Sequence, residues 1–171
     1  LDDTMGPAAF IMSEGKLFGP TYLHVGLDFA LPILMIGFAW FAIWLATDRQ
    51  VTQWINYLRR IAANPVSRPD LTALRHLQHA HLHAVPFENL DIRCGRPLAL
   101  DEAALFDKIV TRRRGGICYE LNTLFAALLR ALGFQVSLLA AEVATGETTF
   151  GPAFDHMALL VVIAERRFLA D

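Results

Sequence analysis

One cysteine, one histidine and one aspartate in the second half of the chain have the side-chain types of a nucleophilic triad. Cys118 follows two glycines in the segment RGGICYELN and begins a predicted helix. A thiol at a helix N-terminus, near basic residues, meets a positive potential that favours the thiolate. His156 opens one apolar segment and Asp171 ends another. Because a thiolate nucleophile needs a base and a third group that orients the base, the set predicts covalent catalysis with Cys118 as nucleophile.

Each of the three residues also has a plainer interpretation. A cysteine in an apolar helix is usually a small buried hydrophobic residue. A lone histidine is more often a satisfied core residue than a base, and an aspartate at the end of a strand usually faces water. The combination is stronger, because two adjacent strands can present His156 and Asp171 side by side toward the helix of Cys118. The preceding Gly115 and Gly116 are expected to let the backbone approach a substrate closely.

The elements that must position this triad are helices first and strands afterwards. Helical spacing predicts a first helix over 51–61 and a second that begins at Leu71, after an Asp70 cap, and ends before Pro86. A third helix is predicted to begin after Asp101, and a fourth covers 121–132 and is closed by Gly133. The segments 134–141, 157–163 and 167–171 follow with the pattern of strands, the second of them buried on both faces. Helices followed by strands indicate an α+β fold.

The N-terminal part of the chain has a different, more apolar composition. The segment 29–47 contains no charged residue and is bracketed by Asp28 and Asp48. About 19 residues at ~1.5 Å rise nearly match the thickness of a bilayer, so a transmembrane helix and membrane anchoring through 29–47 are predicted. Arginines follow this segment, and the positive-inside tendency then places the catalytic part in the cytoplasm. The alternatives are a buried helix of another domain, or a first segment, 1–50, that comes from a fusion or a gene-model error.

The totals exclude other classes of function. The chain has 15 Lys and Arg against 17 Asp and Glu, and this balance gives no reason to expect a nucleic-acid partner. Two cysteines are not a disulfide framework, and a free thiol suits a reducing cytosol. His76, His79 and His83 share one helix face, but no carboxylate or cysteine accompanies them in register, so no metal site is predicted.

Three segments resemble the signature segments of the arylamine N-acetyltransferases. They are VPFENLDI at 85–92, KIVTRRRGGICYELN at 108–122 and FDHMALLV at 154–161. The intervals between Cys118, His156 and Asp171 also match that family. The resemblance runs from about Trp54 to Asp171.

The resemblance implies a fold, a reaction and roles for residues. The fold is that of papain-like cysteine enzymes, with a helical domain over 51–133 that carries the nucleophile and an incomplete β-barrel domain over 134–171. The reaction is a ping-pong transfer from acetyl-CoA through acetyl-Cys118 to an arylamine or hydrazine, with His156 as base and Asp171 orienting it. Glu88 and Arg114 correspond to a structural ion pair near the site. The resemblance assigns no residue here to binding of acetyl-CoA.

The sequence also departs from the family pattern. It stops at Asp171, before the segment and third domain that supply much of the family's CoA contact, and Glu142 and Thr123 replace the usual Arg and Gly. The alternative function is therefore an inactive truncated or fused remnant. A third hypothesis is a thiol-dependent amidohydrolase, since a Cys–His–Asp triad does not itself choose between water and amine.

Overall fold

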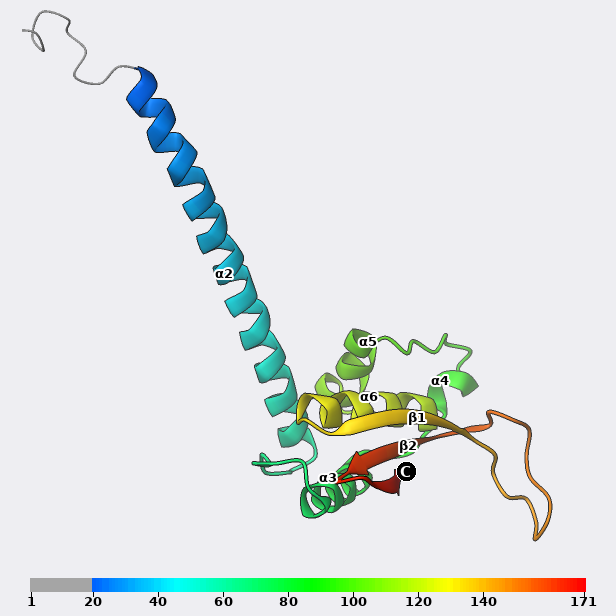
Figure 1. Ribbon diagram of the computed structural model, residues 1–171. Helices are drawn as coiled ribbons and strands as arrows, with labels where there is room; N and C mark the ends of the chain where they lie inside the picture. Colours follow the sequence, from blue (N-terminus) through cyan, green and yellow to red (C-terminus); the bar gives the residue numbers. More distant parts are fainter. Residues whose placement is uncertain (1–19) are drawn as a thin grey trace, which may run out of the picture. The chain divides into compact units, whose positions relative to one another are not determined.

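The computed structural model describes residues 20–171, and the side chains from residue 32 onward. The chain divides into two compact units, with the boundary between Arg49 and Gln50. One long helix, α2 (Pro20–Arg60), crosses this boundary (Figure 1). The apolar segment 29–47 and the predicted helix over 51–61 are therefore parts of one continuous helix.

The prediction of a membrane-spanning helix over 29–47 is not supported. Among the described residues, no helix combines the length and the apolar character that crossing a membrane requires. The arginines that follow this segment therefore do not indicate an orientation in a membrane, and the cytoplasmic location of the catalytic part stays a prediction.

The second unit contains the remaining helices and one sheet. After the end of α2 come α3 (Leu71–Ala84), α4 (Leu90–Arg93), α5 (Glu102–Phe106), the π-helix η1 (Asp107–Thr111) and α6 (Cys118–Ala131). The strands are β1 (Gln135–Ala141), β2 (His156–Ile163) and β3 (Arg166–Ala170). They form an antiparallel sheet in the order β1-β2-β3. The α+β order is confirmed, while the division into a helical and a barrel domain stays a prediction.

The predicted caps fix the helix boundaries. The carboxylate of Asp70 accepts a hydrogen bond from the Ala73 N–H at 2.9 Å, and Asp101 does the same for Ala104 at 2.9 Å. Gly133 has a φ of +90°, a conformation that favours glycine after a helix. These caps could be predicted from the sequence because each depends on one residue type next to an apolar pattern.

Helix α6 is the centre of the core. Its apolar stripe is buried as predicted, and it packs against β1 and β2. The buried stripe consists of Leu121, Leu124, Phe125, Leu128 and Leu129. On β2, Met157, Leu159 and Val161 are buried on one face, while on the other face Ala158 is buried and Leu160 and Val162 are half-buried. The expectation that β2 is buried on both faces is therefore met fully on one face and in part on the other.

One element differs in kind from the prediction. The helix that begins after Asp101 continues as the π-helix η1, which buries three consecutive residues, Lys108, Ile109 and Val110. Lys108 thus lies in the interior beside two apolar neighbours.

Candidate active site

The loop before Cys118 is built from two segments that are distant in sequence. Phe87 and Gly116 form an isolated parallel bridge, in which the Glu88 N–H donates to the Gly116 carbonyl at 2.9 Å. The Gly116 N–H donates to the Pro86 carbonyl at 3.3 Å. Cys118 itself is the first residue of α6 and is buried.

The two glycines before Cys118 are required by this packing. A Cβ on Gly115 would overlap the carbonyl oxygen of Pro86, and a Cβ on Gly116 would lie 2.8 Å from a carboxylate oxygen of Glu120. The sequence led us to expect that these glycines make room for a substrate. The structure instead places the chain's own atoms against them.

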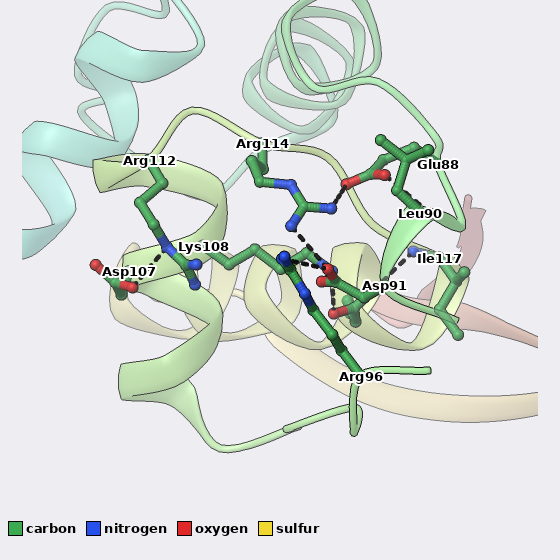
Figure 2. Close-up of polar contacts among 10 residues, drawn as sticks. Glu88, Leu90, Asp91, Arg96, Asp107, Lys108, Arg112, Arg114 and Ile117 are labelled. Carbon is green, nitrogen blue, oxygen red and sulfur yellow. Dashed lines mark hydrogen bonds and ion pairs between the residues drawn. The ribbon is translucent and has the colours of Figure 1, made fainter. Parts of the chain in front are cut away.

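This loop is bound to an ion cluster of Glu88, Asp91, Lys108, Arg114 and Glu120, of which Figure 2 labels the first four. Arg114 binds Glu88 through Nη2 and Asp91 through Nη1, both at 2.7 Å. The Lys108 amino group lies 2.7 Å from Asp91 Oδ2 and 2.6 Å from Glu120 Oε1. The Glu88–Arg114 pair is thus one edge of a larger cluster that the sequence did not reveal.

The cluster reaches the nucleophile through Glu120. While Oε1 of Glu120 binds Lys108, Oε2 accepts a hydrogen bond from the Ile117 N–H at 3.0 Å (Figure 2). This N–H belongs to the residue directly before Cys118, and Glu120 lies in the first turn of α6, where a carboxylate also favours the helix dipole. A charged chain therefore runs from η1 to the backbone that carries Cys118.

The charges of the cluster support one another. Hydrogen bonds from Lys108, and then from Arg114, lower the pKa of Asp91 to about 2. Burial alone would lower the pKa of Lys108, but its hydrogen bonds to Asp91 and Glu120 outweigh burial and raise that pKa. The Lys108 and Glu120 side chains are only 7 % and 3 % exposed, so this pair is shielded from water.

His156 and Asp171 are brought together by the sheet. Ala170 pairs with Leu159, so Asp171 comes opposite residue 158, two positions from His156 and on the same face. His156 Nε2 lies 2.7 Å from Asp171 Oδ2. An ionised carboxylate can only accept, so Nε2 carries the proton and Nδ1 is left as the basic nitrogen.

Asn122 joins this pair to the helix of Cys118. Its Nδ2 donates to the Met157 carbonyl at 2.6 Å and to Asp171 Oδ1 at 3.0 Å. Asn122 lies one turn after Cys118 in α6 and is buried. This role of Asn122 was not predicted from the sequence. The available signal was a polar residue within an otherwise apolar helix face, four positions after the nucleophile.

The three predicted triad residues line one cavity of about 140 Å³. Its other walls come from α3, the PFEN segment and α6, through His81, Leu82, Val85, Phe87, Leu121 and Asn122. The cavity is thus apolar on most sides, with Cys118, His156 and Asp171 on one part of its wall. Such a site can hold a small apolar group next to a thiol and an oriented imidazole.

The histidine-rich helix does not form a metal centre in this structure. Within residues 20–171, no three His, Cys, Asp or Glu side chains are placed to hold a metal ion. The rings of His79 and His83 lie against each other, with centroids 4.2 Å apart, while His81 points into the core toward Tyr57.

Comparison with known proteins gives the family of this chain. Residues 70–171 match the family model described as N-acetyltransferase. The chain is 41 % identical over 117 residues to an arylamine N-acetyltransferase pineal gland isozyme of Gallus gallus, covering 67 % of this chain and 40 % of that protein. It is 42 % identical over 115 residues to the arylamine N-acetyltransferase / N-hydroxyarylamine O-acetyltransferase of Salmonella typhimurium, with 67 % and 41 % covered.

Solved structures agree. The arylamine N-acetyltransferase of Salmonella typhimurium superimposes with a TM-score of 0.65 at 40 % identity, over 70 % of this chain and 43 % of that one. The Mycobacterium marinum arylamine N-acetyltransferase in complex with CoA gives 0.62 at 40 % identity, over 67 % and 44 %.

These matches define a class of α+β acyltransferases. The chain belongs to the N-acetyltransferase family whose relatives are the arylamine N-acetyltransferases. It spans about two-fifths of the length of the curated relatives it matches.

The ion cluster predicts that replacing Lys108 lowers the free energy of unfolding much more than replacing Arg112 does. Lys108→Met leaves Asp91 and Glu120 without their shared cation, and breaking a buried pair costs about 3–5 kcal/mol. Arg112→Met removes an exposed pair with Asp107 and should cost ~0–1 kcal/mol. Urea unfolding at pH 7 measures both. Equal losses for the two variants would show that the cluster does not support the fold.

The low pKa of Asp91 predicts a pH dependence. Unfolded, Asp91 takes up its proton near pH ~3.9, whereas the folded protein holds it ionised down to about pH 2. Its stabilising effect is therefore complete above pH ~4 and lost as the pH falls toward about 2. Asp91→Asn should be less stable than the wild type at pH 7, and the difference in urea midpoint should narrow over that window. Asp107→Asn, at the exposed pair, is the control and should show a small difference throughout. A constant deficit of Asp91→Asn from pH 7 to 2 would contradict this account.

Proposed function

We propose that this protein catalyses acetyl-CoA-dependent N-acetylation of an arylamine or hydrazine through an acetyl group on Cys118. The observation that carries the proposal is the 2.7 Å contact between His156 Nε2 and Asp171 at the wall of the cavity that Cys118 also lines. The family match and the related structure titled as a complex with CoA support acetyl-CoA as the donor substrate.

In the first half-reaction the thiol of Cys118 loses its proton to Nδ1 of His156. The thiolate attacks the thioester carbonyl carbon of acetyl-CoA, a new C–S bond forms, and the C–S bond to CoA breaks. The departing CoA sulfur takes the proton from the imidazolium. Asp171 keeps the imidazole in the tautomer with Nδ1 free and stabilises its positive charge.

In the second half-reaction the amine nitrogen attacks the acetyl carbon on Cys118. The C–N bond forms, the C–S bond breaks, and one amine proton passes to His156 Nδ1 and then to the Cys118 sulfur. Water is the competing acceptor. The apolar wall formed by Leu82, Val85 and Phe87 favours an organic amine over water at this point.

The cysteine assignment is tested by acetylating the protein and determining its intact mass. Incubation with acetyl-CoA alone should add one acetyl group, which peptide mapping should place on Cys118. Cys94 is the matched control, because it is the second cysteine and is exposed. Cys94→Ser should still be acetylated, and Cys118→Ala should not. Acetylation that persists in Cys118→Ala would refute the proposal.

Adding an amine separates transfer from hydrolysis. A transferase should lose the acetyl group from Cys118 only when 4-ethylaniline or a hydrazine is added, and should release the acetylated amine. Loss of the acetyl group at the same rate without amine would indicate a thioesterase or amidohydrolase instead.

The bond from Asn122 to Asp171 predicts a kinetic effect. Asn122→Leu preserves an apolar helix face but leaves Asp171 Oδ1 without its donor, so the imidazole is held less well. We expect amine-dependent transfer to slow by about 100-fold, the scale of a 1 Å misplacement, together with a changed pH profile. Gln78→Ala is the control, because Gln78 binds only the backbone carbonyl of Asp171, and it should change the rate by no more than about threefold. Similar rates for both variants would show that Asn122 does not position the base.

A further inference from the structure

Two side chains of α6 bind the backbone on either side of His156. Asn122 Nδ2 donates to the carbonyl of Met157, the residue directly after His156, at 2.6 Å. The hydroxyl of Tyr119 donates to the carbonyl of Phe154, two residues before His156. Tyr119 and Asn122 are three positions apart in α6, so they lie on one side of the helix. The helix that carries the nucleophile is therefore joined to the chain both before and after the proposed base.

The segment before His156 is a tight turn that contains an unfavourable backbone conformation. The Asp155 N–H donates to the carbonyl of Pro152 at 3.2 Å, which closes the turn. Within the turn, Phe154 has a φ of +66°, a left-handed conformation that is strained for a bulky residue. A residue keeps such a conformation only where the surrounding contacts hold it there.

The hydrogen bond from Tyr119 is the contact that acts on the strained residue from α6. The side chain of Phe154 is 69 % exposed, so its packing contributes little to holding the backbone. The Asp155 carboxylate accepts a hydrogen bond from the Val143 N–H at 3.0 Å, but this bond ties the turn to the other side of the β1–β2 connection. Tyr119 instead binds the carbonyl of Phe154 itself. Its hydroxyl thus both holds the left-handed residue and fixes it to the helix of the nucleophile.

We infer that Tyr119 is a positioning residue, whose hydroxyl holds the turn before His156 so that the imidazole is presented to the Cys118 thiol in their shared cavity. The inference rests on the proposed function. Pairing with Ala141 and the bond to Asp171 fix His156 within the sheet. These two contacts do not relate the sheet to α6, whereas the hydrogen bond from Tyr119 does.

The variant Tyr119→Phe tests this role because it removes the hydroxyl and keeps the ring. It is made in a Cys94→Ser background, so that Cys118 is the remaining thiol. The readout is the rate at which iodoacetamide alkylates Cys118 over a range of pH, because alkylation requires the thiolate and needs no acetyl-CoA. We expect the rate at pH 7 to fall about tenfold and its pH profile to move to higher pH. The loss is smaller than the ~100-fold of a 1 Å misplacement because the sheet still holds His156.

Thr149→Val is the matched control. It removes a hydroxyl from the same connection between β1 and β2, where Thr149 Oγ1 lies 3.1 Å from Thr145 Oγ1, a contact within the connection rather than with α6. This variant should change the rate of alkylation by no more than about threefold. Equal losses in Thr149→Val and Tyr119→Phe would show a general loosening of the connection and would overturn the inference.

A second substitution separates positioning through the turn from packing of the Tyr119 side chain. Asparagine adopts a left-handed conformation more readily than phenylalanine, and it does not loosen the chain as glycine would. Phe154→Asn therefore relieves the strain that the hydrogen bond holds in place. In the Phe154→Asn background, Tyr119→Phe should change the alkylation rate by no more than about threefold. A tenfold loss in both backgrounds would show that Tyr119 acts without the turn, which contradicts the inference.

The alkylation measurement also separates this inference from the proposed function. If acetyl-CoA fails to acetylate Cys118 while Tyr119→Phe still moves the alkylation profile, the transferase proposal is refuted and the positioning role stands. If the wild type is acetylated but Tyr119→Phe is alkylated like the wild type at every pH, the transferase proposal stands and the role of Tyr119 is refuted.

Discussion

The interaction on which the nucleophile loop depends is the buried amino group of Lys108 between Asp91 and Glu120. Without Lys108, the buried carboxylate of Glu120 would have no cation, while Asp91 would keep only its pairs with Arg114 and Arg96. With Lys108 in place, Glu120 has a free oxygen that holds the Ile117 N–H, and Asp91 holds Arg114. A single cation from η1 therefore sets the backbone on both sides of the two glycines that precede Cys118.

The pair formed by His156 and Asp171 is fixed by hydrogen bonds from the neutral amide of Asn122 and by the carboxylate of Asp171 itself. Asn122 is the residue through which the two ends meet, because it shares α6 with Cys118 and donates to both β2 and Asp171. The sheet register alone brings His156 and Asp171 together. Asn122 then relates that pair to the first turn of α6, so the helix carries the nucleophile and also aligns the group that orients its base.

Much of this arrangement could be predicted from the sequence, and the part that could not has a common cause. Residue types, together with the resemblance of three segments to the arylamine N-acetyltransferases, indicated Cys118, His156 and Asp171. The caps at Asp70 and Asp101 gave helix starts, because each cap is a local signal. The burial of Lys108 could not be predicted, since it depends on Asp91 and Glu120, which come from other elements of the chain. The predicted membrane span finds no support among the described residues, and absence of charge over 29–47 does not by itself determine what surrounds a helix.

Polar groups that are costly to bury collect around Cys118 in the described part of the chain. Asn122 and His81 line the cavity, and Lys108 binds Glu120 in the first turn of α6. A core selected for stability alone would fill these positions with apolar side chains, as α6 does one and two turns further on at Leu124 and Leu128. Lys108 positions the backbone before Cys118 through Glu120, and Asn122 positions His156 through Asp171, so the cost of burying these two side chains is offset by the positioning they provide. Within the described part of the chain, the buried Nε2 of His81 has no such compensating partner.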